Sequence, residues 1–210
     1  MFDGSEHFYP TFQRAILRLA SLKGGLVLDI GTPCPFRKEL ARFERDFDGV
    51  RVMTLDYPGT WDKPGDWKAD VGGDIGYLPF KTASVDGVIC KDVLEHVPDP
   101  FAAVSEIHRV LKPGGLAYLA VPGLHPYHAG GVKGAHDYWR FTGEGVEKLC
   151  SKFASTQVRP AGGVVFVARA YAGRPGRVLF HRRLSRLWNF VDRVIPTREF
   201  TYVWMIELQR

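Results

Sequence analysis

Four short apolar runs, separated by stretches with helical spacing, constrain the fold of this chain more than any other feature. The runs are Leu26–Gly31, Val50–Leu55, Val85–Cys90 and Gly115–Val121. A short apolar run bounded by turn residues is typical of a buried strand, and strands that alternate with helices build parallel βαβ units. The sequence therefore predicts an α/β domain with a mostly parallel sheet.

Start and stop signals predict the helices between these runs. Apolar residues at spacings of three and four predict a helix over Tyr9–Ser21, and the glycines that follow end it. Asp99 can cap a helix that begins at Pro100. The buried face expected for that second helix comprises Phe101, Val104, Ile107 and Leu111. Thr142 is expected to open a further helix, which would run to about Lys152.

A length of 210 residues suits one domain. We expect an N-terminal helical segment over residues 1–25, a core over 26–170, a basic helical insertion over 171–200 and a last strand over 201–208. Within these parts, Gly163–Ala170 and Thr201–Leu208 are the late strand candidates. No apolar run is long enough to span a bilayer and the N-terminus lacks the pattern of a signal peptide, so we expect a cytoplasmic protein.

Acidic residues stand at the ends of the predicted strands, where an open parallel sheet binds its ligands. Asp29 lies beside the first turn, Asp56 closes the second strand, and Asp70 follows in the next connection. A carboxylate at the end of a second strand can accept hydrogen bonds from ribose hydroxyls. Alternatively, Asp56 and Asp70 are ordinary solvated turn acids.

Three further segments make the order of these acidic residues along the chain more specific. They are Leu78-Pro79-Phe80, Val93-Leu94-Glu95-His96-Val97 and Arg109-Val110-Leu111-Lys112-Pro113-Gly114-Gly115. In this order and at this spacing they resemble the type 11 group of class I S-adenosylmethionine (SAM)-dependent methyltransferases, from about Leu26 to Phe141. The resemblance implies a Rossmann-like sheet of seven strands in the order 3-2-1-4-5-7-6, with helices on both faces and SAM across the carboxyl ends of the first strands.

By position, the resemblance also assigns cofactor contacts. Asp56 would hold the ribose, Asp70 with Val71 the adenine, and Lys91 with Asp92 the methionine part of SAM. The full cofactor-binding set comprises Asp29, Gly31, Thr32, Asp56, Tyr57, Asp70, Val71, Lys91 and Asp92. Glu95 and His96 would follow close to the transferred methyl group.

The first turn departs from the family pattern. Pro33 stands where a second glycine would let the backbone approach SAM, and proline offers no N–H. The sequence therefore leaves open a binding module on the same fold with weakened or lost SAM binding. The turn also lacks the glycine patterns of nicotinamide-binding folds and of P-loops, which argues against both classes.

The segment over residues 122–142 is rich in histidine and aromatic residues, and similar segments in type 11 relatives lie where acceptors enter. The predicted catalytic residues are His96, His128, His136 and Asp137, because imidazole can act as a general base near neutral pH. The predicted substrate contacts are His125, Tyr138, Trp139 and Arg140. Alternatively, the segment only folds over the site, its aromatic residues are packing and Arg140 pairs with Asp137 or Glu144.

The same segment raises the question of a metal. Its histidines, with Asp137 nearby, include residue types that suit zinc or iron, but their spacing lies on no evident helix, so the sequence predicts no metal site. Taken together, these features predict a SAM-dependent methyltransferase that acts on an oxygen or nitrogen of a small-molecule or saccharide-like acceptor.

Positive charge is concentrated near the C-terminus. Residues 169–198 hold eight arginines and one acid, so the rest of the chain is slightly acidic although the formal net charge is +5. Residues 177–195 have the pattern of an amphipathic basic helix, which could rest on an anionic membrane or hold a lipid-linked acceptor. Alternatively, its apolar face packs on the sheet. We expect no nucleic-acid partner, because the basic residues are confined to one stretch without an RNA-binding motif.

Overall fold

The computed structural model describes residues 5–31, 45–58, 69–129, 136–179, 187, 190–191, 194–195 and 200–210. The elements in chain order are α1 (Ser5–Ala20), β1 (Leu26–Ile30), β2 (Arg51–Asp56), β3 (Val71–Gly72), η3 (Ile75–Tyr77), β4 (Val85–Lys91), η4 (Leu94–His96), α3 (Pro100–Val110), β5 (Leu111–Pro122), α4 (Gly143–Leu149), β6 (Ser155–Ala161), α5 (Val164–Leu179) and β7 (Val203–Gln209). The four apolar runs all form strands, as the sequence predicts.

The strands form one seven-stranded sheet in the order β3-β2-β1-β4-β5-β7-β6, which confirms the predicted order. Neighbouring strands from β3 to β5 pair in parallel, and β7 pairs antiparallel with both β5 and β6. Because β1 lies between β2 and β4, the connections diverge at β1. The carboxyl ends of β1 and β4 therefore border the crevice in which open α/β sheets bind ligands.

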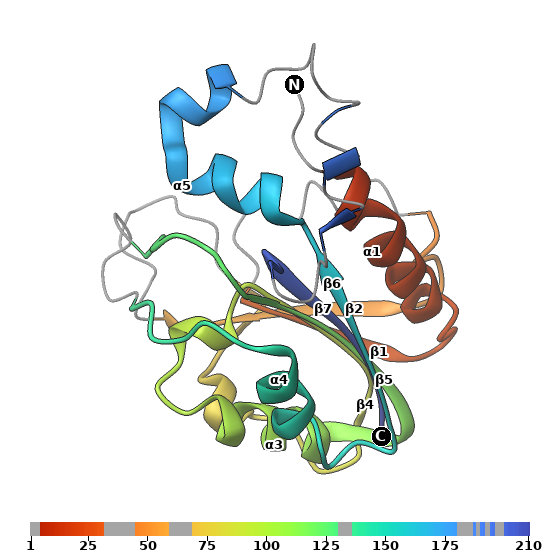
Figure 1. Cartoon of the computed structure of the whole chain (residues 1–210). Helices are drawn as coiled ribbons and strands as arrows, with labels where there is room; N and C mark the ends of the chain where they lie inside the picture. Colours follow the sequence, from red (N-terminus) through yellow and green to blue (C-terminus); the bar gives the residue numbers. More distant parts are fainter. Residues whose placement is uncertain are drawn as a thin grey trace.

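Helices cover both faces of the sheet (Figure 1). Successive side chains of a strand point to opposite faces, so Val27 packs with α1 while Leu28 packs with α3 and α4. The α1 face is built around Phe12 and Ile16, which belong to the predicted helical stripe. Both faces of the central strands are buried, which explains why their sequences are continuous apolar runs rather than alternating ones.

Helix α3 begins as predicted but buries a different face. The Asp99 side chain accepts a hydrogen bond of 3.0 Å from the backbone N–H of Ala102, and Pro100 is the first helical residue. Phe101, expected in the core, is 54% exposed. Leu111 is buried as expected, but it begins β5 instead of ending the helix. The buried side chains of the helix are Pro100, Ala103, Val104, Ile107 and Val110.

The strand expected over Gly163–Ala170 is wrong, because this run lies in α5 from Val164 onwards. The strand that precedes it is β6, which pairs only with β7 at the edge of the sheet. An edge strand tolerates polar residues and proline, and β6 contains Arg159 and Pro160. The expected strand over Thr201–Leu208 is confirmed as β7.

The basic stretch over residues 177–195 is only partly described. Helix α5 ends at Leu179, and Arg182, Arg183, Arg186 and Arg193 lie outside the described residues. Contact of this stretch with an anionic membrane therefore stays a prediction. In the part of the chain that the structure describes, no helix combines the length and the apolar character needed to cross a bilayer.

Candidate active site

The turn after β1 requires a glycine. Gly31 has a φ of +71°, in the left-handed region that glycine adopts without a steric penalty. Its backbone N–H donates a hydrogen bond of 2.7 Å to the carbonyl oxygen of Leu55 at the end of β2. A Cβ atom at this position would lie 2.2 Å from Cγ2 of Val93, so Val93 packs directly against the turn. Thr32 and Pro33, which continue the turn, lie outside the described residues.

The predicted ribose and adenine residues lie together at the carboxyl ends of β2 and β3. Asp56 is in register with Gly72, and its Oδ1 accepts a hydrogen bond of 2.8 Å from the backbone N–H of Tyr57. Asp70 accepts hydrogen bonds through Oδ2 from the backbone N–H and the hydroxyl of Thr54, at 2.9 and 2.7 Å. These bonds fix Asp70 to β2 and thereby place Val71 beside the end of that strand.

The other predicted cofactor residues lie on the two central strands. Asp29 belongs to β1, is 1% exposed and sits between Thr54 of β2 and Ile89 of β4. At the end of β4, Lys91 Nζ lies 3.3 Å from the Asp92 carboxylate. Asp92 has a left-handed φ of +55°, and its N–H donates to a backbone carbonyl of β5.

A carboxylate and two histidines meet just beyond β4. Glu95, in η4, is 0% exposed, and neither carboxylate oxygen has a hydrogen-bond partner among the described residues. Its Oε1 lies 3.3 Å from Nε2 of His128 and 3.7 Å from Nε2 of His96. The Glu95 carboxylate raises the pKa of His128 above its ordinary value. We call these three residues the Glu95 cluster.

The histidine-rich segment folds back over η4 and supports this cluster. Backbone N–H groups of Tyr138 and Trp139 donate to the carbonyl oxygen of Glu95, at 2.8 and 3.3 Å. The ring of His96 hydrogen-bonds through Nδ1 to the carbonyl oxygen of His136. Asp137 accepts a hydrogen bond of 2.9 Å from the backbone N–H of His128. The segment is therefore attached to η4 through the backbone carbonyl of Glu95 and the ring of His96.

Arg140 holds the segment in this shape. It pairs with both carboxylate oxygens of Asp137, so of the two expected partners it takes Asp137. It also donates to the carbonyl oxygens of His125 and Pro126, at 2.7 and 2.9 Å. The guanidinium holds the pKa of Asp137 well below its usual range. Asp137 is thus ionised at neutral pH, and both of its carboxylate oxygens already accept hydrogen bonds.

The structure brings together some of the predicted acceptor residues and separates others. The His125 ring lies 4.6 Å from that of His128, and burial lowers the pKa of His125. His136 is exposed, with its ring 5.2 Å from that of Tyr138. Tyr138 and Trp139 are 48% and 42% exposed. Sequence reasoning placed Glu95 near the methyl group but gave it no role. Its position inside the V-L-E-H segment, one of the three motifs of the resemblance, was the signal that could have identified it as a site residue.

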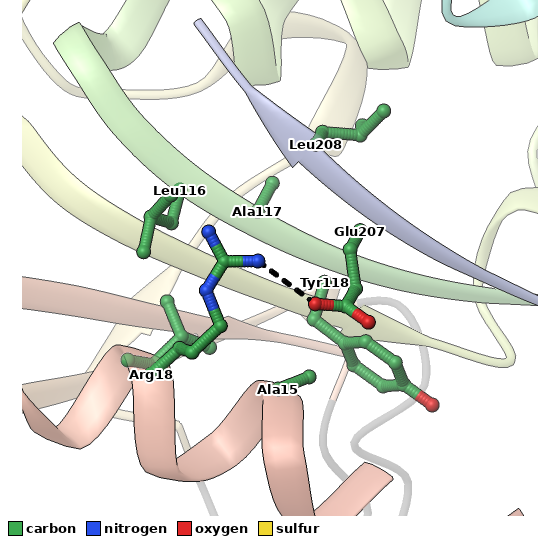
Figure 2. Close-up of a pocket in the computed structure, with 8 residues that line it drawn as sticks. Ala15, Arg18, Leu116, Ala117, Tyr118, Glu207 and Leu208 are labelled. Carbon is green, nitrogen blue, oxygen red and sulfur yellow. Dashed lines mark hydrogen bonds and ion pairs between the residues drawn. The ribbon is translucent and has the colours of Figure 1, made fainter. Parts of the chain in front are cut away.

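A shallow pocket lies elsewhere, on the face of the sheet that α1 covers (Figure 2). Its polar groups already form an ion pair, since Arg18 donates to Glu207 of β7 at 2.9 Å. Arg14 and Arg159 each lie 3.7 Å from the other carboxylate oxygen. These contacts join α1 to the sheet, so the pocket's polar groups are structural.

Comparison with known proteins agrees with the fold. Residues 38–119 match a family model described as "Methyltransferase domain". An uncharacterized methyltransferase of Mycobacterium sp. (strain JLS) is 33% identical in an alignment 129 residues long that covers 56% of this chain and 50% of that protein. The chain thus spans about half the length of the curated relatives it matches first.

Solved structures share the fold at low sequence identity. A SAM-dependent methyltransferase from Archaeoglobus fulgidus is 16% identical with a TM-score of 0.61, over 98% of this chain and 94% of that one. A 1,6-didemethyltoxoflavin-N1-methyltransferase from Burkholderia thailandensis, with its substrate and S-adenosylhomocysteine bound, is 17% identical with a TM-score of 0.56, over 96% and 76%. The solved structures show that the chain has the fold of SAM-dependent methyltransferases, and the family model over residues 38–119 supports the resemblance to the type 11 group of class I.

Proposed function

We propose that this chain transfers the methyl group of SAM to an oxygen or nitrogen atom of a small-molecule or saccharide-like acceptor. The observation that carries the proposal is the packing of Val93 against Gly31. This contact joins the turn where the family binds SAM to η4, which carries two members of the Glu95 cluster. A cofactor subsite and a polar acceptor subsite would then be neighbours.

The residues at the carboxyl ends of β1 and β2 have the chemistry that SAM requires. The Asp56 carboxylate offers oxygens that can accept hydrogen bonds from ribose hydroxyls, the role of its counterpart in dinucleotide folds. Gly31 makes the tight turn that brings backbone close to the ligand. When bound, SAM supplies a methyl group on a sulfonium, which is already a good electrophile. The protein's remaining task is to align the acceptor.

We assign the acceptor to the Glu95 cluster and to His125 beside it. The His96 Nδ1 contact with a backbone carbonyl requires the N–H at Nδ1, so in the neutral imidazole the lone pair lies on Nε2, which faces the cluster. The contacts of Asp137 favour a positioning role, because Arg140 and the His128 backbone occupy its oxygens. His136 would act through its carbonyl, which orients His96. The Burkholderia relative, which acts on a small molecule, supports an acceptor of that class.

A methyl-transfer assay over a broad panel of hydroxyl and amine acceptors tests the proposal. We expect turnover with at least one small or saccharide-like acceptor, a higher KM for SAM in Asp56→Asn and a lower kcat in His128→Gln. Asp48→Asn, at an exposed acid remote from the site, is the matched control and should leave both constants unchanged. SAM binding without transfer to any acceptor would count against the proposal.

The alternative function is a non-catalytic binding module, which Pro33 favours because it removes a backbone donor from the first turn. In that case the natural chain would not bind SAM, and Pro33→Gly would create affinity. If the natural chain binds SAM and Pro33→Gly changes its affinity little, this alternative is excluded.

A further inference from the structure

We propose that the Glu95 cluster binds a divalent transition-metal cation, Zn²⁺ in the first instance, through Glu95 Oε1, His96 Nε2 and His128 Nε2. These three atoms lie within 4.8 Å of one another. Two of the separations are 3.3 and 3.7 Å. Ligand atoms about 2.0–2.1 Å from a tetrahedral zinc are roughly 3.3 Å apart. A small inward movement of the His96 ring would complete the arrangement.

The buried carboxylate of Glu95 points to a positive ligand. The residue is 0% exposed, and its oxygens have no hydrogen-bond partner among the residues described. A carboxylate buried in this way is unfavourable unless a charge compensates it. Lysine and arginine do not contact it within the described chain, and its two close basic neighbours are the histidines of the cluster. A bound dication would supply the missing compensation.

The groups behind both histidines orient their Nε2 atoms for coordination. His96 binds a backbone carbonyl through Nδ1, as described above. His128 Nδ1 lies 3.4 Å from Asp137 Oδ2 and 3.4 Å from the carbonyl oxygen of Pro126. Histidines that ligate metals usually donate their other ring N–H to a carboxylate or a backbone carbonyl. Arg140, by fixing Asp137, would keep the second of these supports in place.

Two histidines and a glutamate are the ligand set of catalytic zinc sites, which keep a position open for water or substrate. If the proposed function holds, that position suits a hydroxyl oxygen of the acceptor. The metal would lower the pKa of this hydroxyl, whose proton leaves to solvent while the oxygen keeps its electron pair for the methyl group. The inference thus narrows the acceptor to a hydroxyl compound and makes His96 and His128 ligands instead of bases.

Metal binding can be measured without SAM or acceptor, on the full chain after dialysis against a chelator. We expect calorimetry to show one Zn²⁺ per chain, and Co²⁺ to give the visible absorption of a low-symmetry site. Glu95→Gln and His128→Asn should each weaken Zn²⁺ binding by about 100-fold or more, since loss of an outer-shell group alone costs roughly 10- to 100-fold. His108→Asn is the control, because this histidine lies on α3 against Phe153 and should leave the affinity unchanged.

Thermal unfolding gives a second readout. Without metal, at a pH above the raised pKa of His128, Glu95→Gln should melt no lower than the parent, because it removes a buried charge that no protonated histidine then balances while keeping the side-chain shape. With Zn²⁺, only the parent and His108→Asn should melt higher. Zn²⁺ binding that is equally tight in Glu95→Gln, or a marked loss of stability in metal-free Glu95→Gln, would overturn the proposal. Should Glu95→Gln fail to fold, His96→Gln provides the same comparison.

The two proposals fail in different ways. Loss of SAM binding with intact Zn²⁺ binding would remove the proposed function and leave the metal site. Methyl transfer that persists unchanged in the metal-free chain, together with no stoichiometric Zn²⁺ binding, would remove the metal site alone.

Discussion

Replacing Gly31 by alanine should strain the fold exactly where the cofactor turn meets η4. The left-handed φ of +71° costs an L-residue roughly 1–2 kcal/mol. The added Cβ would lie 2.2 Å from Val93 Cγ2, and overpacking of this kind costs about 1–3 kcal/mol. We therefore expect Gly31→Ala to lower the free energy of unfolding by about 2–5 kcal/mol.

The matched control is Gly114→Ala, at a glycine with a φ of +77° and no atom within 4 Å of the added Cβ. It should cost only the backbone term of about 1–2 kcal/mol. For a chain of this size each kcal/mol corresponds to roughly 2–4 °C in melting temperature, so Gly31→Ala should melt about 4–20 °C lower and Gly114→Ala about 2–8 °C lower.

Thermal and urea unfolding of both variants, followed by calorimetry with SAM, measure these effects. SAM affinity should fall in Gly31→Ala and stay unchanged in Gly114→Ala, because only the first glycine lies at the predicted cofactor subsite. Equal destabilisation of the two variants would refute the contact between Val93 and the turn. Undiminished SAM binding by Gly31→Ala would refute the importance of the turn.

Three other substitutions test contacts around the site and the sheet. Glu207→Gln removes the carboxylate that three arginines share, and should cost about 1–3 kcal/mol in urea unfolding, less than a fully buried pair because the arginines are partly exposed. Arg109 lowers the pKa of Glu106 from its ordinary value of 4.5, so this contact stabilises the fold above about pH 4.5 and its contribution is lost as the pH falls through the lowered pKa. The stability difference between the parent and Glu106→Gln, about 0.5–1.5 kcal/mol at neutral pH, should therefore disappear in acid, and a constant difference would contradict the assignment. Thr54→Val removes both hydroxyl contacts to Asp70 and should cost about 1–3 kcal/mol, with a matching loss of SAM affinity; unchanged unfolding would show that Asp70 is held by other groups.

Local signals were sufficient to predict the central strands and the starts of α3 and α4, whereas α1 begins at Ser5, before the expected Tyr9. The runs that become β1, β2, β4 and β5 are apolar because both faces of these strands are buried, and Asp99 and Thr142 cap helices through their own side chains. Such features depend on neighbouring residues alone. The strand order came from the resemblance, not from these patterns.

The wrong predictions of secondary structure and burial occur where packing between distant segments determines the structure. The run Gly163–Ala170 is apolar enough for a strand, but such a run is also compatible with a helix, and it belongs to α5. The preceding edge strand β6 has no apolar run to mark it. Phe101 is exposed because the helix turns a neighbouring face towards the sheet, and the amphipathic pattern alone did not fix that rotation.

The candidate site was predictable only in part. The order of the motifs placed Asp56, Asp70 and His96 at or just beyond the carboxyl ends of the strands. The structure places them there as well. The approach of His128 to Glu95 was not predictable, because it depends on how residues 136–142 fold back and on the Arg140 contacts that shape them. The Glu95 cluster therefore becomes visible only once the fold brings His128 next to Glu95 and His96.

Calorimetric titration with SAM and with S-adenosylhomocysteine, on the parent chain and on Asp56→Asn, tests the central claim most directly. We expect both ligands to bind the parent with one site per chain. The variant should bind roughly 10- to 100-fold more weakly, as expected for the loss of hydrogen bonds to a charged group. Absence of binding by the parent, or equal binding by the two proteins, would contradict the placement of SAM at the carboxyl ends of β1 and β2.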